Sequence, residues 1–319
     1  MNNLKKIGLT ALAGSLVATS VAYSGELAVS GSASMNFKNF SDSFTGKTVS
    51  MGNSVYFTGG GETDGGLNVN VSFELDSGAA NNSANNWDNH FVAVGNDSLG
   101  TLTVHGHGGA NSAAALDTTA AGDLWDNTLI NTTAPASTRM APISSTSGNN
   151  LMVYSLPTLV DGLAVAGSYQ ATNTTGSGST AFGITYAGIE GLSLSYGQGS
   201  SDNVKDIEGD QTIMKASYAY GPVTVAASNN DFDHTTSTID QEVSSVSLSY
   251  TVSDQVSVSY GEETIDRSGK ASDIEVSGVS ISYTSGGMTA SFAQVEAENV
   301  DHTASLNKEV WKIGLSFAF

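Results

Sequence analysis

The last nine residues of the chain constrain its fold more than any other stretch. Apolar side chains alternate with small or polar ones up to the final residue. The apolar positions are Trp311, Ile313, Leu315, Phe317 and Phe319. Side chains of a strand point alternately to its two faces, so one face of this strand is apolar to its end. The last strand of a transmembrane β-barrel needs such a face because it closes the wall, whereas the alternative is the last strand of a soluble β-protein.

The composition favours β-structure with one polar face. The 319 residues include 36 Gly and only 4 Pro, and 13% are charged, about half the usual charged fraction. Aromatic and β-branched residues recur regularly, which argues against disorder. The absence of Cys excludes disulfides and thiol chemistry, and 31 acids against 11 bases give a net charge of −20. Beyond the N-terminus no apolar run approaches the roughly 20 residues of a helical membrane span.

The N-terminal segment has the features of a secretory signal peptide. The basic pair Lys5-Lys6 precedes a mostly apolar run, and small residues follow. We expect cleavage after Ala22 or Ser24, so that residues 1–22 are the signal peptide. Removal of the two lysines leaves 9 bases and 31 acids in the mature chain, a net charge of −22.

The same alternation recurs along the chain in segments of roughly ten residues, as in outer-membrane barrels. Tight turns alternate with longer loops between these segments. The run Glu62-Thr63-Asp64-Gly65-Gly66 is a strong tight-turn signal because Asp and Gly tolerate positive φ. We therefore predict an all-β fold over residues 23–319, a transmembrane antiparallel up-and-down barrel of about 16 strands.

Outward-facing aromatic residues separate a membrane barrel from a soluble one. On alternate strands they lie beside the tight turns, at Tyr186, Tyr220, Tyr250, Tyr283 and Phe319. On the remaining strands they lie beside the long loops, at Phe37, Phe73, Tyr169, Tyr196 and Tyr260. Two aromatic bands at opposite ends of the wall are expected at two membrane interfaces, and random scatter would not sort them by strand direction.

One long segment, residues 108–148, interrupts the strand pattern. A barrel of about sixteen strands has a lumen too wide for side chains to fill, so it holds water. Folded inward as the third long loop, the segment would narrow this lumen to a constriction whose charges set selectivity. Its candidate residues are Asp117, Asp123, Asp126 and Arg139. The alternative is an outer lid with solvated acids.

Inward positions of the strands are mostly Ser, Thr, Asn and Gly, with few charges. The inward charged residues are Lys38, Glu74, Lys215 and Lys312. Bases on the wall that face acids on the loop would set a transverse field across the opening. His105 and His107 are predicted to share the inward face of the strand before the loop. A His-x-His pair can bind a metal, but without a third ligand nearby in sequence we assign both to pore lining and predict no metal site.

The outer loops are acidic, notably around residues 202–210 and 231–233 and at 296–301. Such loops could bind Ca²⁺ through their carboxylates, or their acids could simply be solvated. We expect no other cofactor.

Several motifs resemble those of the general diffusion porins of Gram-negative bacteria, particularly the alphaproteobacterial type. They are the strand Gly25–Gly31, the run Gly61–Leu67, the strand end Tyr154-Ser155-Leu156-Pro157, and Phe319, which resembles the signal read by the outer-membrane barrel assembly machinery. The resemblance covers the whole chain. It implies a homotrimer of 16-stranded barrels in the outer membrane, among lipids and lipopolysaccharide, with the third loop folded inward. Small hydrophilic solutes and ions would pass by passive diffusion, and no nucleic acid is an expected partner.

One departure from that family concerns charge. Those porins usually line the constriction with an arginine-rich cluster, and this chain has only Arg139 and Arg267. We therefore expect a weakly cation-preferring pore for solutes and cations.

Other functions would need features that the sequence lacks. A substrate-specific channel for sugars would need an inward aromatic track, and one for phosphate would need more inward lysines. A barrel enzyme would need a positioned nucleophile and base, and no catalytic motif surrounds any of the five histidines. We predict that the protein is not an enzyme. An adhesin or a passive structural barrel remains as an alternative that conductance would decide.

Overall fold

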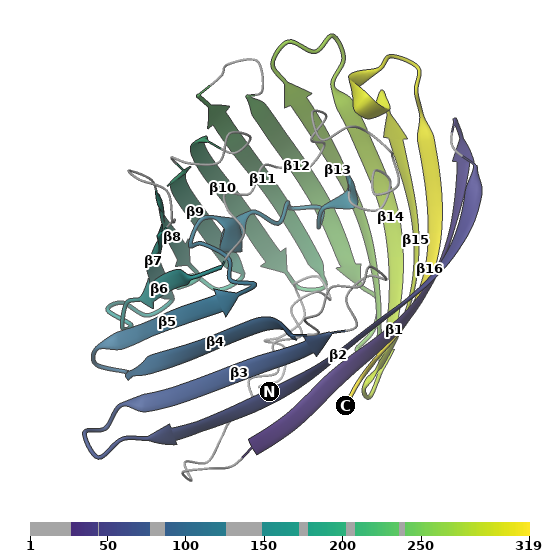
Figure 1. Ribbon diagram of the computed structural model, residues 1–319. Coiled ribbons are helices and arrows are strands. Elements are labelled where there is room, and N and C mark those ends of the chain that lie inside the picture. Colours follow the sequence, from purple (N-terminus) through teal and green to yellow (C-terminus); the bar gives the residue numbers. More distant parts are fainter. Residues whose placement is uncertain are drawn as a thin grey trace.

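The computed structural model describes residues 27–43, 45–76, 87–125, 149–171, 178–201, 208–235 and 240–319. Over these residues, sixteen antiparallel strands form a closed barrel, in which each strand pairs with its sequence neighbours and the first pairs with the last (Figure 1). This confirms the predicted 16-stranded fold. None of the helices in the described part of the chain is long and apolar enough to cross a membrane. The predicted signal peptide lies outside the described residues and stays a prediction.

The strands differ in length, and the first two are the longest. They are β1 (Leu27–Asp42), β2 (Gly46–Glu62), β3 (Asn68–Asp76), β4 (Trp87–Asn96), β5 (Gly100–His107), β6 (Leu151–Ser155), β7 (Leu163–Ala171), β8 (Gly178–Tyr186), β9 (Leu192–Ser201), β10 (Gly209–Tyr220), β11 (Val223–His234), β12 (Gln241–Thr251), β13 (Val256–Arg267), β14 (Ile274–Ser285), β15 (Met288–Glu298) and β16 (Lys308–Ala318). Among the described loop residues, η1 (Ala114–Leu116) and η3 (Val300–His302) form short 3₁₀ helices.

The terminal residue takes part in closing the wall. The Phe319 amide donates to Gly31 O at 2.9 Å, and the Gly31 amide donates to Phe319 O at 2.8 Å. The ring of Phe319 lies over Gly31, where an added Cβ would meet ring atoms at 2.6 Å. The missing side chain at Gly31 therefore makes room for the terminal aromatic ring at the β1–β16 seam.

The lower half of the wall, near the tight turns, has an apolar outside and a polar inside. Tyr220, Tyr250 and Tyr283 are exposed at strand ends beside the tight turns, as predicted. On the inner face, serine hydroxyls of β13 and β14 lie opposite each other, with Ser257 Oγ 2.7 Å from Ser282 Oγ. Such hydroxyl pairs line a lumen that favours water.

The upper half of strands β12 to β16, near the long loops, has the opposite polarity. Apolar side chains there point inward and form a buried cluster that η3 covers. The buried members are Val243, Ile265, Ile274, Val276, Val295, Ala297, Val300 and Val310, with Phe40, Leu124, Trp125 and Leu306 packed against them. This upper part of the wall is built like the sheet of a soluble protein, with a core on one face.

Carboxylates occupy the outer face at the same level. They come from strands β10 to β16 and are Asp210, Asp231, Asp233, Glu242, Glu262, Asp266, Glu275, Glu296, Glu298 and Glu309. Several lie directly opposite one another across strands, as Glu296 does to Glu309. Exposed carboxylates of this density belong in water or in a headgroup layer rather than in hydrocarbon. The change of polarity therefore marks where the wall leaves the apolar layer.

Candidate pore constriction

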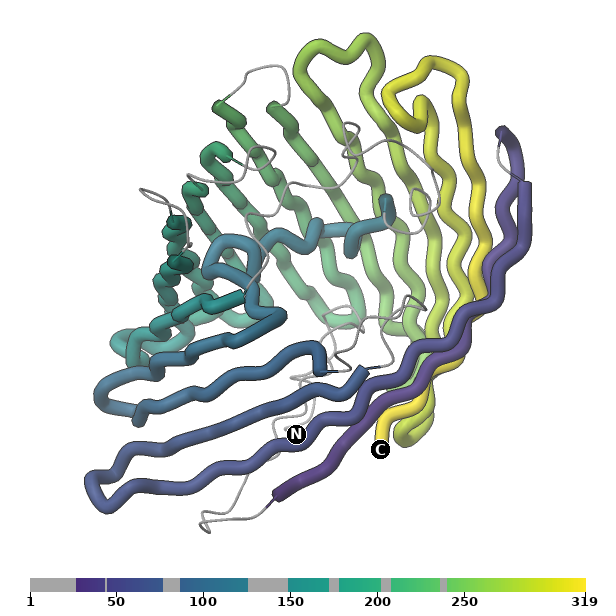
Figure 2. Tube along the Cα trace, in the orientation of Figure 1, coloured from purple at the N-terminus to yellow at the C-terminus, as the bar shows by residue number. Residues whose placement is uncertain are grey.

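The segment after β5 crosses the inside of the barrel. Figure 2 shows it as the tube that leaves β5 and runs across the interior toward β13 and β14. Its described part, residues 108–125, is held by the inner faces of several strands. The inward-folded third loop that the sequence predicted is therefore present over these residues.

The first half of the loop packs as a small apolar turn. Asn111 Oδ1 accepts from the backbone amides of Ala113 and Ala114 at 3.0 and 2.8 Å, just before η1. Ala113 is fully buried against Ala181 of β8 and Ile213 of β10. This contact fixes the loop to the wall before its charged residues begin.

Glycines on the inner wall provide the space into which the loop fits. A Cβ added at Gly183 would lie 2.3 Å from Ser112 O, and one at Gly261 would lie 2.5 Å from Ala121 Cβ. A Cβ at Gly278 would come within 3.1 Å of a Leu124 methyl group. These close approaches explain why the wall under the loop carries glycine in the middle of strands, where it otherwise weakens them.

We expect Gly261→Ala to push the loop away from the wall. The added methyl overlaps Ala121, and such overpacking costs about 1–3 kcal/mol. The expected result is a noisier and altered single-channel conductance, measured in a planar bilayer, with unchanged barrel folding. Gly46→Ala on β2 is the matched control, because a Cβ there meets no atom within 4 Å. Equal conductance traces for the two variants would contradict this account of the glycines.

The second half of the loop is bound by a single buried carboxylate, Glu263 of β13. Glu263 Oε1 accepts from the Leu124 amide at 3.0 Å, and Oε2 accepts from the Trp125 amide at 2.9 Å. The Thr119 hydroxyl also donates to Oε1. The side chain is 2% exposed, so its charge is compensated by the loop's donors rather than by water.

Serine hydroxyls of the wall bind the loop backbone beside this carboxylate. The Ala120 amide donates to Ser228 Oγ at 2.8 Å, and the Ala121 amide donates to Ser245 Oγ at 2.9 Å. Ser247 Oγ donates in turn to Ala120 O at 2.7 Å. Inward serines, which the sequence suggested only as polar lining, therefore also satisfy the backbone of the loop.

Lys215 lies beneath the loop and not on the wall facing it. Its Nζ donates to Thr118 O at 2.6 Å. The prediction that Lys215 stands opposite the loop's acids is therefore wrong, because alternation gives the face of a strand but not which part of the lumen the loop covers. Its ammonium instead lies close enough to Asp117 and Asp123 to interact with their charges.

The two described acids of the loop have different environments. Asp123 Oδ1 accepts from the Thr119 amide at 2.9 Å, and Thr119 Oγ1 accepts from the Asp123 amide at 2.8 Å, so these residues close a turn within the loop. Burial raises the pKa of Asp117 to about 7, and the charge of Asp123 adds to this rise while Lys215 opposes it. Asp117 is therefore a carboxyl group that changes charge near neutral pH.

Lys38 and Lys312 lie directly opposite each other on the inner face of the β1–β16 seam. Phe40, two residues along β1, packs against the same apolar cluster as Leu124 and Trp125. The two lysines are thus near the level at which the described part of the loop ends. Lys308, which the sequence analysis did not single out, is buried on the same seam with its Nζ 4.9 Å from the centre of the Phe40 ring.

Glu74 and the histidines line the other side of the lumen in different ways. Glu74 is buried and accepts from Tyr56 Oη at 2.7 Å and from Asn89 Nδ2 at 2.6 Å. The ring centre of His105 lies 5.5 Å from that of Phe91 on the inner face. Glu74 is therefore committed to structural hydrogen bonds.

The prediction that His105 and His107 share one face is wrong. A register shift in the β4–β5 ladder pairs His105 with Phe91 but His107 with His90, the adjacent residue on β4. Adjacent residues of a strand face opposite sides, and a bulge changes where a side chain points. His107 Nδ1 instead lies 3.1 Å from Asp88 Oδ1. In the described part of the chain, no group of three or more acids and histidines is arranged to hold a metal ion.

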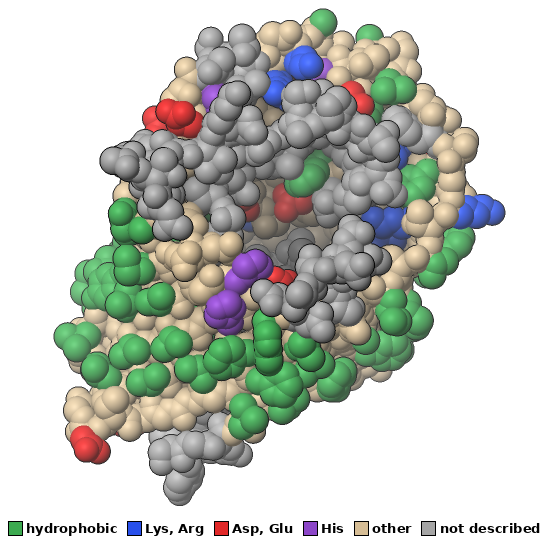
Figure 3. All heavy atoms as spheres, viewed as in Figure 1, with side chains coloured by type: hydrophobic (Ala, Val, Ile, Leu, Met, Phe, Trp, Pro, Cys, Tyr) green, Lys and Arg blue, Asp and Glu red, His purple; other side chains and the backbone are tan. Residues whose placement is uncertain are grey.

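Two predicted constriction residues, Asp126 and Arg139, lie outside the described residues. The residue holding the loop that sequence reasoning missed is Glu263. Its signal was present, because alternation places it inward between Gly261 and Ile265, where an acid is unexpected. Figure 3 shows acidic side chains inside the opening and hydrophobic ones over the outer wall below it.

Comparisons with known proteins agree with this architecture. A family model described as Gram-negative porin matches residues 8–303. An anion-selective porin from Comamonas acidovorans superposes with a TM-score of 0.71 at 14% identity, covering 92% of this chain and 99% of that chain. A triple mutant of the Rhodopseudomonas blastica porin gives 0.65 at 14% identity, covering 92% and 100%. A porin refined at 1.8 Å gives 0.64 at 18% identity with the same coverage. No curated protein sequence matches the chain.

Proposed function

Because the chain belongs to the Gram-negative porin family, and is therefore an outer-membrane channel and not an enzyme, we propose a specific function for it. We propose that it is a general diffusion pore with a weak preference for cations. The observation that carries the proposal is the loop bound along the inner wall by Glu263, Ser228 and Ser245. A loop fixed in this way narrows a water-filled lumen without needing a ligand. Small hydrophilic solutes and ions would then pass through the remaining opening.

The cation preference is supported by the distribution of charge. The chain has 31 acids and 11 bases, and outward carboxylates line the β10–β16 side of the mouth of the barrel. Asp117 and Asp123 stand on the constriction loop, while the Lys215 ammonium is engaged by a backbone carbonyl. A negative potential at the entrance raises the local concentration of cations. Lys38 and Lys312 oppose this effect, so the preference is expected to be weak.

Planar-bilayer recording under a salt gradient tests this proposal. We expect stepwise increases of ohmic conductance as protein inserts, and a reversal potential of the sign that cation flux gives. A folded, heat-modifiable barrel that adds no conductance would overturn the open-pore function. A reversal potential of the opposite sign would leave the pore in place and assign the selectivity to the Lys38–Lys312 pair.

We further propose that three copies assemble through the outer face of β1 and β2. In contrast to β10–β16, the described outward positions of these two strands carry no carboxylate. Val49 and Met51 are 79% and 73% exposed, among the highest values for apolar residues in the described chain. Apolar side chains exposed to this extent at the long-loop end favour contact with a second copy over contact with headgroups.

We expect the double variant Val49→Glu, Met51→Glu to run as a monomer on unheated gels and in size-exclusion chromatography. The reason is that each charge would be buried without a partner at the subunit contact. Ser244→Glu, on the outer face of β12, adds a charge away from the proposed interface and should leave the trimer intact. A trimer that survives the double substitution would place the interface elsewhere on the wall.

A further inference from the structure

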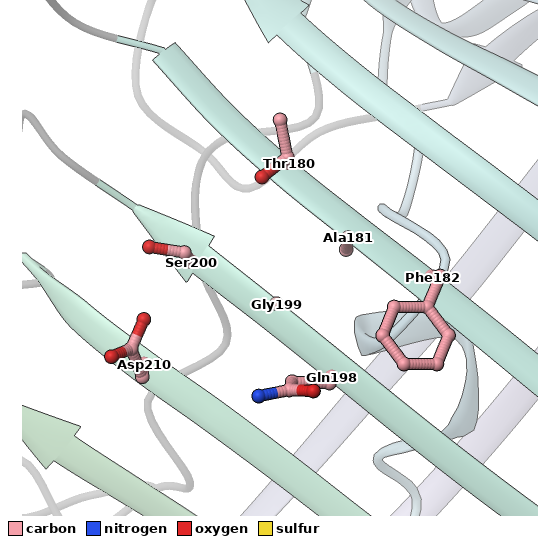
Figure 4. Close-up of a pocket in the computed structure, with 7 residues that line it drawn as sticks. All are labelled: Thr180, Ala181, Phe182, Gln198, Gly199, Ser200 and Asp210. Carbon is pink, nitrogen blue, oxygen red and sulfur yellow. The ribbon is translucent and has the colours of Figure 1, made fainter.

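We propose that a groove on the outer face of strands β8, β9 and β10 binds the neutral sugar ring of an outer-leaflet glycolipid. The groove is shallow and open, with a volume of about 250 Å³. It is lined by Thr180, Ala181, Phe182, Gln198, Gly199, Ser200 and Asp210 (Figure 4). It has no part in the channel described above, because it lies on the other side of the wall.

The outward orientation of the groove follows from what lies on the inside. Ala181 packs against Ala113 of the constriction loop, and a Cβ on Gly199 would meet Ala113 Cβ at 3.5 Å. The alternate residues Thr180, Gln198 and Ser200 therefore face away from the lumen. Asp210 is outward by the same argument, since its neighbour Gln211 is buried on the inner side.

Strand register places these side chains in two adjacent rows. Thr180, Ser200 and Asp210 are successive cross-strand partners in the upper row. Phe182 and Gln198 are partners in the row below. The polar groups of three neighbouring strands thus gather on one area about 10 Å wide, because neighbouring strands lie about 4.8 Å apart. This is wide enough for one sugar ring with its hydroxyl groups.

The groove lies at the upper edge of the apolar band. The ring centres of Phe182 and Tyr196 are 5.8 Å apart, and both side chains are exposed on the outer face. Tyr196 belongs to the aromatic band beside the long loops, which marks the level of the outer headgroups. The occupant of a polar groove at that level is the headgroup of a lipid whose chains lie along the band below.

The lining chemistry selects a sugar over a phosphate. Thr180 and Ser200 hydroxyls and the Gln198 amide both donate and accept hydrogen bonds, while the Asp210 carboxylate accepts them. Sugar hydroxyls match this set, and the Phe182 ring offers an apolar face for the C–H groups of a pyranose. Among the described residues, no Lys or Arg lines the groove. Asp233 also lies opposite Asp210 in the ladder, so these carboxylates would repel a phosphate.

The size of the groove fits one ring. Pockets for drug-sized ligands measure roughly 300–1,000 Å³, and this groove is smaller. It is also open toward the bilayer side, which suits a headgroup that remains attached to its acyl chains.

Native mass spectrometry of the full-length refolded protein tests the proposal. The probe is monogalactosyl diacylglycerol in a sugar-free detergent, with phosphatidylglycerol of the same acyl chains as the anionic comparison. We expect the galactolipid to bind more tightly than phosphatidylglycerol and to remain bound in EDTA. Preference for phosphatidylglycerol, or binding that requires Ca²⁺, would overturn the proposal in favour of a cation bridge between carboxylates and phosphate.

Two variants locate the binding. Ser200→Leu fills the groove and should weaken galactolipid binding by roughly tenfold or more, since it removes both space and a hydrogen bond. Ser244→Leu makes the same change on the outer face of β12 and should bind as the unmodified protein does. Asp210→Asn keeps the shape of the groove and should weaken galactolipid binding by a few-fold. It replaces Ser200→Leu as the test variant if Ser200→Leu fails to form the heat-modifiable barrel. Unchanged binding in a folded groove variant would contradict the site.

Discussion

Glu263→Ala releases the constriction loop and raises both the conductance and the current noise of the single channel. The carboxylate accepts hydrogen bonds from the amides of Leu124 and Trp125 and from the hydroxyl of Thr119, and it is buried. Removing one partner of a buried charged interaction costs about 3–5 kcal/mol, which is less than the sum of its separate hydrogen bonds, so we expect docking of the loop to weaken by about 3–5 kcal/mol. At 1.4 kcal/mol per tenfold, the undocked population rises roughly 100-fold to several thousand-fold.

Two variants separate this effect from a general loss of stability. Glu263→Gln keeps the shape and one acceptor oxygen, so its conductance should lie between those of the unmodified protein and Glu263→Ala. Glu262→Gln alters the adjacent outward carboxylate, which accepts only from Tyr260 Oη at 2.6 Å among the described contacts, and should leave conductance unchanged. A Glu263→Ala channel with the original conductance and noise would show that the loop is held by other contacts.

The second large expected effect is a pH dependence of selectivity through Asp117. A carboxyl group is neutral below its pKa and charged above it, and the pKa of Asp117 is raised to about 7. The loop therefore becomes more negative as pH rises from 6 to 8, and cation preference should increase over that range. The raised pKa of Asp117 also means that the free energy of unfolding decreases as pH rises from 3.8 to about 7. Over that range the folded state holds a proton that the unfolded state has lost.

Reversal potentials measured from pH 5 to pH 9 check this expectation. Asp117→Asn should remove the step centred near pH 7, while Asp123→Asn should move its midpoint to lower pH because one repelling charge is gone. His105 on the inner face also gains a proton as pH falls, so the comparison of Asp117→Asn with the unmodified protein is the decisive one. If the unmodified protein and Asp117→Asn show the same step in reversal potential, the titrating group is His105 and not Asp117.

The fold could be predicted from the sequence because lipid imposes a simple rule on each strand. Side chains that face hydrocarbon must be apolar and aromatic residues collect at the interfaces, so alternation at residues such as Tyr250 and Tyr283 reveals the wall. The closing role of Phe319 follows from the same rule. The inward loop could be predicted from its length and its lack of alternation.

The details of the constriction could not be predicted because they depend on tertiary contacts. Alternation places Lys215 inward but does not show that the loop lies over it. The shift that separates His107 from His105 comes from one extra residue in a ladder, which alternation does not reveal. Glu263 was missed because alternation places it on the inner face of β13 but does not show that the loop covers that part of the wall.

The reversal of polarity along β12–β16 has a consequence for the thickness of the membrane that this barrel suits. From β12 into the turn that follows it, the outward apolar side chains run only from Val246 to Val252. This is a rise of about 20 Å at about 3.3 Å per residue, before the tilt of the strand shortens it further. A bilayer thicker than this would have to cover Glu242 and its neighbours with hydrocarbon. The height of this apolar band therefore sets the bilayer thickness that the barrel matches. We expect insertion of the protein to become steadily less efficient as the acyl chains of the host lipid lengthen.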